Sequence, residues 1–344
     1  MTDGKDGKDG EVGKVAMPRF LLSVISVLSV FSVISCSLPN TPRTRITIPH
    51  GSSFQAVTDT LRAHDLIASP AWFRTLARVR GLDRNVRAGI YDVPQGAPAW
   101  AVLDLLANGA QAMVRVSVPE GVTVADIAAI AESALMVPAE SVMVAAQDDA
   151  LRDELGVPGT SLEGFLFPET YMVTAGSSAR DLLRQMVKEG QRQWDPSWDS
   201  LLAAQGLSRL QAVTLASIVE GEARVDDERE IIAGVYLNRV KRGMPLQADP
   251  TVQYAIQLAT GRRKPRLYEK DYQFRSPYNT YLNPGLPPGP VNSPSRRSLE
   301  AVVHPREVPW LFFVAGEGGR HVFSRTYREH LRAIAMVRSG APKP

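Results

Sequence analysis

The 344-residue chain has little of what most metal and redox sites need. It has one cysteine, Cys36, so no disulfide can form within the chain, and zinc sites built from several cysteines are excluded. None of its histidines has the i, i+4 spacing that places two ligands on one face of a helix. These five residues are His50, His64, His304, His321 and His330. The sequence therefore predicts neither a metal site nor a cofactor.

An excess of charge of one sign is also missing. The chain carries 39 basic and 36 acidic residues, a formal net charge of +3. Nucleic-acid binding needs a concentrated basic face, so nucleic acid is not an expected partner. Hydrophobic residues make up 44% and charged residues 22%, which is an ordinary globular balance. At ~100–200 residues per domain, the length predicts two domains.

Several nucleophile and phosphate-binding motifs are absent as well. The sequence has no G-x-S-x-G elbow, no S-x-x-K, no G-x-x-x-x-G-K-[ST] and no G-x-G-x-x-G. These absences exclude the usual serine nucleophiles and phosphate cradles. Carboxylates remain as the candidate catalysts.

The N-terminal region holds one long apolar run, residues 20–38. No charged residue lies between Arg19 and Arg43, and the run approaches the ~20 residues that a membrane-spanning helix needs. The preceding residues 1–19 are rich in Gly, Lys and Asp and are predicted to be disordered.

Three interpretations of this run stay open. It is a single transmembrane anchor, which we favour, or a cleaved signal peptide. In the third interpretation it is a lipoprotein signal, because Val33-Ile34-Ser35-Cys36 resembles a lipobox. All three place the remainder of the chain outside the cytoplasm.

The remainder is predicted to be an α+β protein with a small and a large unit. Residues 44–117 alternate strand and helix patterns, with helices beginning at Ser52 and Ser69, and contain no clustered carboxylates. Residues 118–340 form the larger, mixed α/β unit. Its predicted elements are a helix beginning at Thr123, helices over 179–191, 208–223, 226–242, 295–303 and 326–338, and strands at 310–315 and 321–324. Residues 244–294 show little helical period and predict long functional loops.

The strongest catalytic candidates are Glu220 and Glu222, which follow the apolar run ending at Val219. Two positions apart on a helix, they point about 200° apart and cannot share one face. The one that points inward would have a raised pKa and could donate a proton at neutral pH. The alternative is that both glutamates cap the helix or pair with Arg224 and Arg229, and the spacing alone favours this alternative.

Three further polar clusters could bind a glycan. Acids beside aromatic rings are common in sugar sites, and amides bind hydroxyl and N-acetyl groups. The first cluster lies in LEGFLFPETY, the second in PLQADPTVQYAI and the third in YNTY. The candidate residues are Glu163, Glu169 and Tyr171, then Gln247 and Asp249, then Tyr278, Asn279 and Tyr281.

Together these stretches resemble the YceG-like family of endolytic murein transglycosylases. The matching segments run in order along the chain and cover LEGFLFPETY, ASIVEGEA, E-R-x-x-x-A-G-V-Y-L-N-R, GMPLQADPTVQYA and SPYNTYLNPGLPPGPVNSPS (162–171, 216–223, 228–239, 243–255 and 276–295). AGIYDVPQG (88–96) and VPEGVTV (118–124) resemble the LysM-like module that precedes the catalytic domain. The resemblance covers nearly all of residues 20–338.

The resemblance implies a membrane-anchored lytic enzyme whose catalytic domain lies on the extracytoplasmic side of the inner membrane. It would cut the β-1,4 bond between N-acetylmuramic acid and N-acetylglucosamine and leave 1,6-anhydro ends, ending the growth of nascent strands. Glu220 would be the catalytic glutamate, acting without a second carboxylate. Peptidoglycan strands and peptidoglycan synthases are the implied partners. Gly221 and Ala223 depart from the family pattern beside Glu222.

Two other functions remain open from the sequence. The protein could be a non-catalytic, peptidoglycan-binding scaffold of the cell-wall machinery, which would bind strands without cleaving them. It could also be a hydrolase that pairs Glu220 with Glu163 or Glu169, because hydrolases use two carboxyl groups ~5–9 Å apart.

Overall fold

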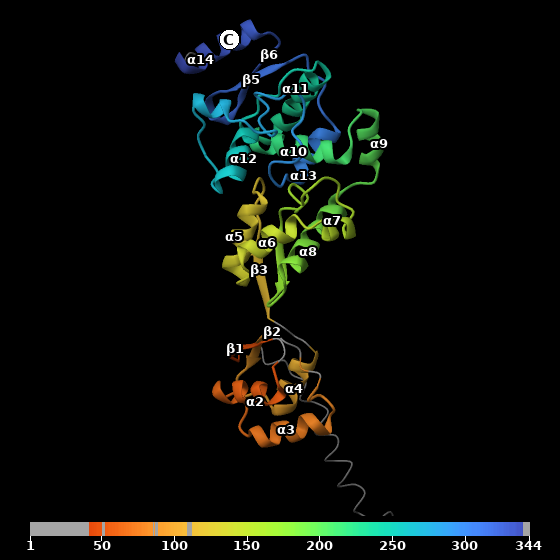
Figure 1. The fold of residues 1–344 in the computed structure, drawn as a ribbon, viewed down its shortest axis with the longest axis vertical. Coiled ribbons are helices and arrows are strands. Elements are labelled where there is room, and N and C mark those ends of the chain that lie inside the picture. The colour runs from red at the N-terminus through yellow and green to blue at the C-terminus, as the bar shows by residue number, and fades with distance from the viewer. Residues whose placement is uncertain (1–40, 50–51, 85, 87–88, 109–111, 340–344) are drawn as a thin grey trace, which may run out of the picture.

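The structure, a computed structural model, describes residues 41–339 except 50–51, 85, 87–88 and 109–111. The predicted tail 1–19 and apolar run 20–38 lie outside the described residues. Within the described part, no helix combines the length and apolar character needed to span a bilayer. The chain forms a small unit at one end of an elongated molecule and a larger unit beyond it (Figure 1).

The small unit packs three helices against a two-stranded antiparallel sheet, in which Ile46 pairs with Tyr91. Its elements are β1 (Arg43–Ile48), α2 (Phe54–Ala63), α3 (Pro70–Val79), β2 (Gly89–Pro94) and α4 (Ala99–Asn108). Ser69 caps α3 as predicted, accepting from the Trp72 amide. The cap of α2 is Ser53 rather than Ser52, because the Ser52 hydroxyl donates instead to the Pro49 carbonyl.

The two units meet at a second antiparallel ribbon. β3 (Met113–Ser117) pairs with β4 (Thr170–Thr174), and the Ala112 amide donates to the Ile90 carbonyl of β2 over 2.7 Å. β3 lies within the range 44–117 predicted for the small unit, yet its partner strand belongs to the larger one. The domain boundary itself stays a prediction.

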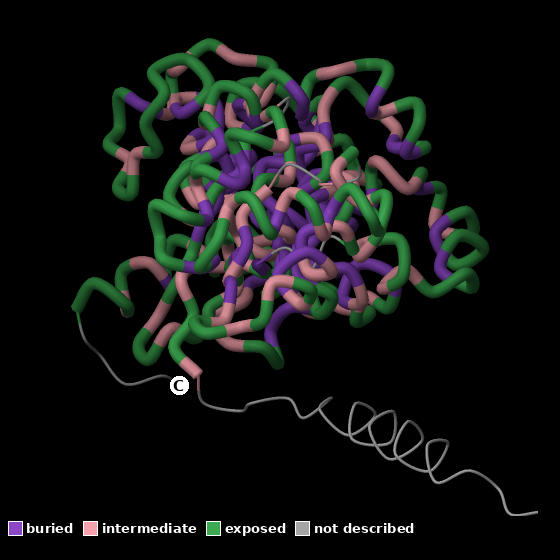
Figure 2. Tube along the Cα trace, turned by 90° about the horizontal axis from the view of Figure 1, so that it is seen from below, coloured by how far each residue is buried: buried purple, intermediate pink, exposed green. Residues whose placement is uncertain are grey.

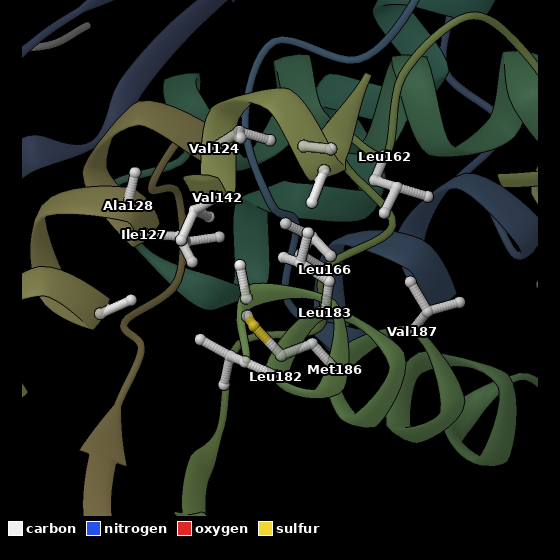
Figure 3. Packing of buried hydrophobic residues seen from close by; sticks show 14 of the residues in the cluster. Val124, Ile127, Ala128, Val142, Leu162, Leu166, Leu182, Leu183, Met186 and Val187 are labelled. Carbon is white, nitrogen blue, oxygen red and sulfur yellow. The ribbon is translucent and has the colours of Figure 1, made fainter. Parts of the chain in front are cut away.

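The first half of the larger unit is a helical layer on this ribbon. It consists of α5 (Val124–Leu135), α6 (Ala139–Ala146), α7 (Asp149–Glu154) and α8 (Ala179–Gln193). Thr123 begins α5 with a full capping box to Asp126, as predicted. Figure 3 shows side chains of three helices, Ile127, Val142 and Leu183, converging in one apolar core.

The second half surrounds α10, whose residues Ala212–Val219 are all buried. A helix that is apolar all round belongs in the centre of a domain, and α10 contacts α9, α11, α12 and α13. These elements are α9 (Ser197–Ala204), α10 (Arg209–Glu222), α11 (Arg229–Lys241), α12 (Asp249–Thr260) and α13 (Arg296–Val303). Figure 2 shows the buried residues gathered inside the trace and the exposed ones around it.

The predicted late strand pair is confirmed. β5 (Phe312–Ala315) and β6 (His321–Ser324) are antiparallel, and α14 (Tyr327–Ser339) packs on them at the far end from the small unit (Figure 1). The prediction for residues 244–294 was partly wrong, because α12 occupies Asp249–Thr260. Its buried positions include Thr251 and Gln257, and such polar residues hide a helical apolar period.

Candidate active site

Glu220 lies in the last turn of α10, and only 6% of its side chain is exposed. Ser295, the N-cap of α13, donates to Glu220 Oε2 through its amide over 2.9 Å and through its hydroxyl over 2.5 Å. On the other side, Arg229 Nη1 lies 3.1 Å from Glu220 Oε1. Both carboxyl oxygens are therefore held in fixed positions by charged or hydrogen-bonding donors.

Arg229 is itself fixed by its neighbours. Its Nη1 donates to Ser298 Oγ over 2.5 Å, and its Nε donates to Asp226 Oδ1 over 3.2 Å. Only 10% of its side chain is exposed. The guanidinium therefore joins α10, α11 and α13 at a single point beside Glu220.

The loop that precedes α5 covers one side of Glu220. Gly121 lies against it, because a Cβ added at Gly121 would be 3.7 Å from Glu220 Cγ. The Gly121 amide donates to the Ser293 carbonyl over 2.8 Å, and the Ser293 amide donates to the Val122 carbonyl over 2.8 Å. Gly121 has a φ of +72°, a conformation that favours glycine. The loop is thus tied to the segment that holds Ser295.

Glu120, in this loop, is a second carboxylate near the site. Its pKa is raised, first by burial and then by the negative charge of Glu220, while Arg229 and Arg297 act in the opposite direction. Sequence reasoning missed Glu120, because VPEGVTV (118–124) was assigned to the resemblance with the LysM-like module.

Glu222 has different neighbours, as the helical spacing predicts. Tyr236 Oη donates to Glu222 Oε1 over 3.1 Å. Burial, and then the charge of Asp249, raises the pKa of Glu222 to about 7. Glu222 is therefore the inward glutamate with a raised pKa that the sequence led us to expect. Glu220 instead pairs with Arg229, one of the two arginines named in the alternative interpretation.

Gly221 separates the two glutamates and allows α12 to approach α10. A Cβ at this position would lie 2.5 Å from Pro250 Cγ, closer than two carbon atoms can pack. Asn292 lies beside the same glycine, fully buried, and donates to the Ser217 carbonyl over 2.9 Å. The close approach explains why a larger residue cannot stand at Gly221 in this chain.

The predicted loop residues divide into two groups. Tyr281 Oη donates to Asp249 Oδ1 over 2.7 Å, and the ring of Tyr281 lies 4.5 Å from that of Tyr272. Asp249 also acts on Glu222, so these groups form one polar cluster near Glu222.

The other loop residues serve mainly the loop itself. Asn279 is fully buried. Its side-chain Nδ2 donates to the carbonyls of Tyr272 and Phe274, and its Oδ1 accepts from the backbone amide of Tyr281. Tyr278 packs edge-on against Tyr254 at 5.0 Å. Gln247 is exposed with a φ of +49°.

Glu163 lies at the start of α5 rather than beside Glu220. Its carboxyl group accepts from the Val124 amide over 3.1 Å and from Tyr254 Oη over 3.2 Å. It is 5% exposed, and this burial raises its pKa to about 8. Burial therefore favours the protonated form of this carboxyl group.

Glu169 and Tyr171 lie at β4. Glu169 is exposed and its carboxylate accepts from the Thr170 amide, whereas Tyr171 is buried in the core and donates to the Phe167 carbonyl over 2.5 Å. Neither Glu163 nor Glu169 shares a hydrogen-bonding partner with Glu220 among the described residues.

Among all residues that the structure describes, no three His, Cys, Asp or Glu side chains are grouped to hold a metal ion.

Comparisons with known proteins agree on one family. The model of the YceG-like family matches residues 46–336. An endolytic murein transglycosylase of Bacillus subtilis is 33% identical over 304 residues, covering 84% of this chain and 83% of that protein.

Two further similar proteins have lower sequence identity. An endolytic murein transglycosylase of Streptococcus pneumoniae is 28% identical, and the match covers 84% of this chain but only 57% of that longer protein. A solved YceG-like protein of Listeria monocytogenes superimposes with a TM-score of 0.58 at 29% identity, over 85% of this chain and 99% of that one.

Proposed function

The chain belongs to the YceG-like family, and on that premise we propose that it is a peptidoglycan lytic transglycosylase. Its bond would be the β-1,4 linkage between N-acetylmuramic acid and N-acetylglucosamine. The relatives described as endolytic murein transglycosylases support this reaction class. The observation that carries the proposal is the position of Glu220, held at the end of α10 by Ser295 and Arg229.

Glu220 acts twice in the proposed reaction. In the substrate complex Glu220 is protonated, unlike the ion-paired carboxylate of the free chain, and its proton passes to the glycosidic oxygen as the bond from that oxygen to the anomeric carbon of the muramic sugar breaks. The carboxylate then takes the proton of the muramic 6-hydroxyl, whose oxygen bonds to the same anomeric carbon. Glu220 ends with one proton, as it began, and no water is consumed. The substrate supplies the nucleophile, so the second carboxylate of ordinary glycosidases is not needed.

Ser295 and Arg229 serve this cycle by holding the carboxylate that forms after proton transfer. Donors that are in place before charge develops need no reorganisation during the reaction. Arg229 is a positioning residue in this account, because it acts through Glu220. Glu120, whose pKa responds to the charge of Glu220, borders the same site.

We assign glycan contacts to the polar cluster around Asp249, Tyr281 and Glu222, with Gln247 and Tyr278 at its edges. Tyrosine rings cover the apolar faces of sugars, and carboxylates accept from their hydroxyl groups. The two glutamates that flank Gly221 would thereby have separate roles. Glu220 would transfer the proton, and the cluster around Glu222 would position the strand.

We further propose that residues 20–38 anchor the protein in the inner membrane, with the remainder outside the cytoplasm. The apolar run is close to the ~20 residues needed for a span. In that place the enzyme would end the growth of nascent strands beside the peptidoglycan synthases. The small unit would be the LysM-like module that holds the strand.

The test uses the purified full chain and uncrosslinked glycan strands. Mass spectrometry of the products should find 1,6-anhydro ends with the parent and with Glu140→Gln, and none with Glu220→Gln. Glu140 is an exposed acid of α6, so its change controls for the loss of one charge. Binding without any cleavage by the parent would instead support the scaffold function, and equal activity of Glu220→Gln would remove Glu220 from its role.

A further inference from the structure

A cavity of about 210 Å³ lies where the start of α5 meets α12, apart from the contacts around Glu220. Its polar lining is Glu163, Gln257, Gln147 and Ser161, and Met143 and Ala146 supply apolar wall. Leu258 and Gly261, which are exposed, also line it. The cavity is therefore small, mixed in character and open to the surface on one side.

Gln257 lines this cavity, and the network around it fixes the orientation of its amide. The Thr123 hydroxyl donates to Asp126 Oδ2 over 2.8 Å, so it can only accept from Gln257. The Gln257 Nε2 group donates to it over 3.0 Å. Among the described residues, this leaves Oε1 of a side chain that is 7% exposed without a donor. A buried acceptor without a partner is destabilising, and a ligand donor would relieve this.

Glu163 supplies the complementary group. It lines the same cavity, and burial raises its pKa to about 8, which favours the protonated form of the carboxyl group at neutral pH. A neutral carboxyl group has an O–H donor that a carboxylate lacks. Glu163 and Gln257 thus offer a donor and an acceptor beside the apolar wall of the cavity.

The cavity lies close to Glu220 along a short stretch of chain. Gly121 touches the Glu220 side chain, and the Val124 amide donates to Glu163 over 3.1 Å. Three residues span at most about 10 Å when fully extended. The Gly121 backbone beside Glu220 and the Val124 backbone beside Glu163 are therefore at most about 10 Å apart, and we infer that a sugar next to the cleaved bond reaches the cavity.

We propose that this cavity is an acetamide subsite of the transglycosylase, which takes the N-acetyl group of a sugar near the cleaved bond. The acetamide N–H donates to Gln257 Oε1, its carbonyl accepts from the Glu163 carboxyl group, and its methyl packs against Met143 and Ala146. The inference rests on the proposed function for its substrate. A peptide amide of the muramic stem has the same hydrogen-bonding groups, and the experiment separates the two sources.

The experiment measures KM and kcat of the purified full chain and of Gln257→Leu on strands whose stem peptides have been removed. Loss of one hydrogen bond of about 1.4 kcal/mol corresponds to a tenfold change. We expect KM to rise about tenfold with kcat nearly unchanged. Gln253→Leu, one turn earlier on α12, is the matched control, because Gln253 bonds only to the exposed Pro265 carbonyl among described residues. Thermal unfolding confirms that each variant is folded.

A second arm removes the acetyl groups from the same strands. The parent should then show the raised KM, Gln257→Leu should add nothing to it, and chemical re-acetylation should restore the difference. An unchanged KM for folded Gln257→Leu on acetylated strands overturns the proposal. An effect that appears only when stem peptides are present assigns the cavity to a peptide amide and also overturns it.

The subsite and the reaction can fail separately. Calorimetry in the Glu220→Gln background measures strand binding without turnover, and Gln257→Leu should weaken it about tenfold there as well. If the parent makes no anhydro product but this weakening persists, the proposed reaction fails and the subsite stands. If anhydro product forms and the weakening is absent, the subsite alone fails.

Discussion

Arg229 Nη1 lies 3.1 Å from Glu220 Oε1 and also donates to Ser298 Oγ over 2.5 Å. One guanidinium thus holds the candidate acid of α10 against α13. Lysine cannot make this set of contacts, because its ammonium group is a point charge without the planar fork of arginine. The contact predicts a specific role for Arg229 in orienting Glu220.

Arg229→Lys should lower kcat by as much as about 10²-fold, because a misplaced catalytic group can cost that much in rate. KM should change little. The measurement is the initial rate of anhydro-end formation over a range of strand concentrations. Arg306→Lys is the matched control, since Arg306 forms an exposed pair with Glu230. If the fall in activity only follows the folded fraction, Arg229 has a structural role alone.

Gly221→Ala should destabilise the fold and impair activity. Its Cβ would lie 2.5 Å from Pro250 Cγ, and overpacking of this kind costs about 1–3 kcal/mol. Gly190→Ala makes the same change in α8, where the new Cβ would meet Phe167 Cβ at 3.4 Å, and should be tolerated. Thermal unfolding of the two variants compares them, and equal melting temperatures would contradict the packing argument.

Stability should fall as the pH rises from about 5 to 8. The pKa of Glu163 is raised to about 8 and that of Glu222 to about 7, both mainly by burial. Each group binds its proton more tightly in the folded than in the unfolded chain. Its contribution is therefore complete below the unfolded pKa and is lost as the pH rises through the folded value.

Glu163→Gln should remove part of this loss, on the order of a few kcal/mol between the two ends of the range. Urea unfolding of parent and variant at pH 5.5 and pH 8 measures the difference. Glu140→Gln, which changes an exposed acid of α6, should keep the slope of the parent. A slope that Glu163→Gln leaves untouched would show that this carboxyl group is not the source.

The sequence predicted the helices whose ends carry clear signals. Ser178 and Ser208 begin α8 and α10 with capping boxes, and apolar residues follow at helical spacing. α12 was not predicted because polar residues, among them Thr251 and Gln257, occupy part of its buried face. The apolar residues of α12 therefore do not show a clear helical spacing. Propensity and period carry no information about such positions.

The candidate site was only half predictable for a similar reason. Glu220 could be found because it follows a long apolar run, but its partner Ser295 lies 75 residues further along the chain. Arg229 could be named as a partner from its nearness in sequence, whereas Glu120 could not. Contacts between distant segments depend on the tertiary fold, which local patterns do not encode.

The most direct test of the account is to run the reaction in ¹⁸O-labelled water and weigh the new glycan ends. The 6-hydroxyl of the muramic sugar is the proposed nucleophile, so the parent should yield 1,6-anhydro ends, lighter than reducing ends by one water, with no ¹⁸O incorporated. Glu220→Gln should yield no new ends. Reducing ends that carry one ¹⁸O atom would instead identify water as the nucleophile and contradict the account.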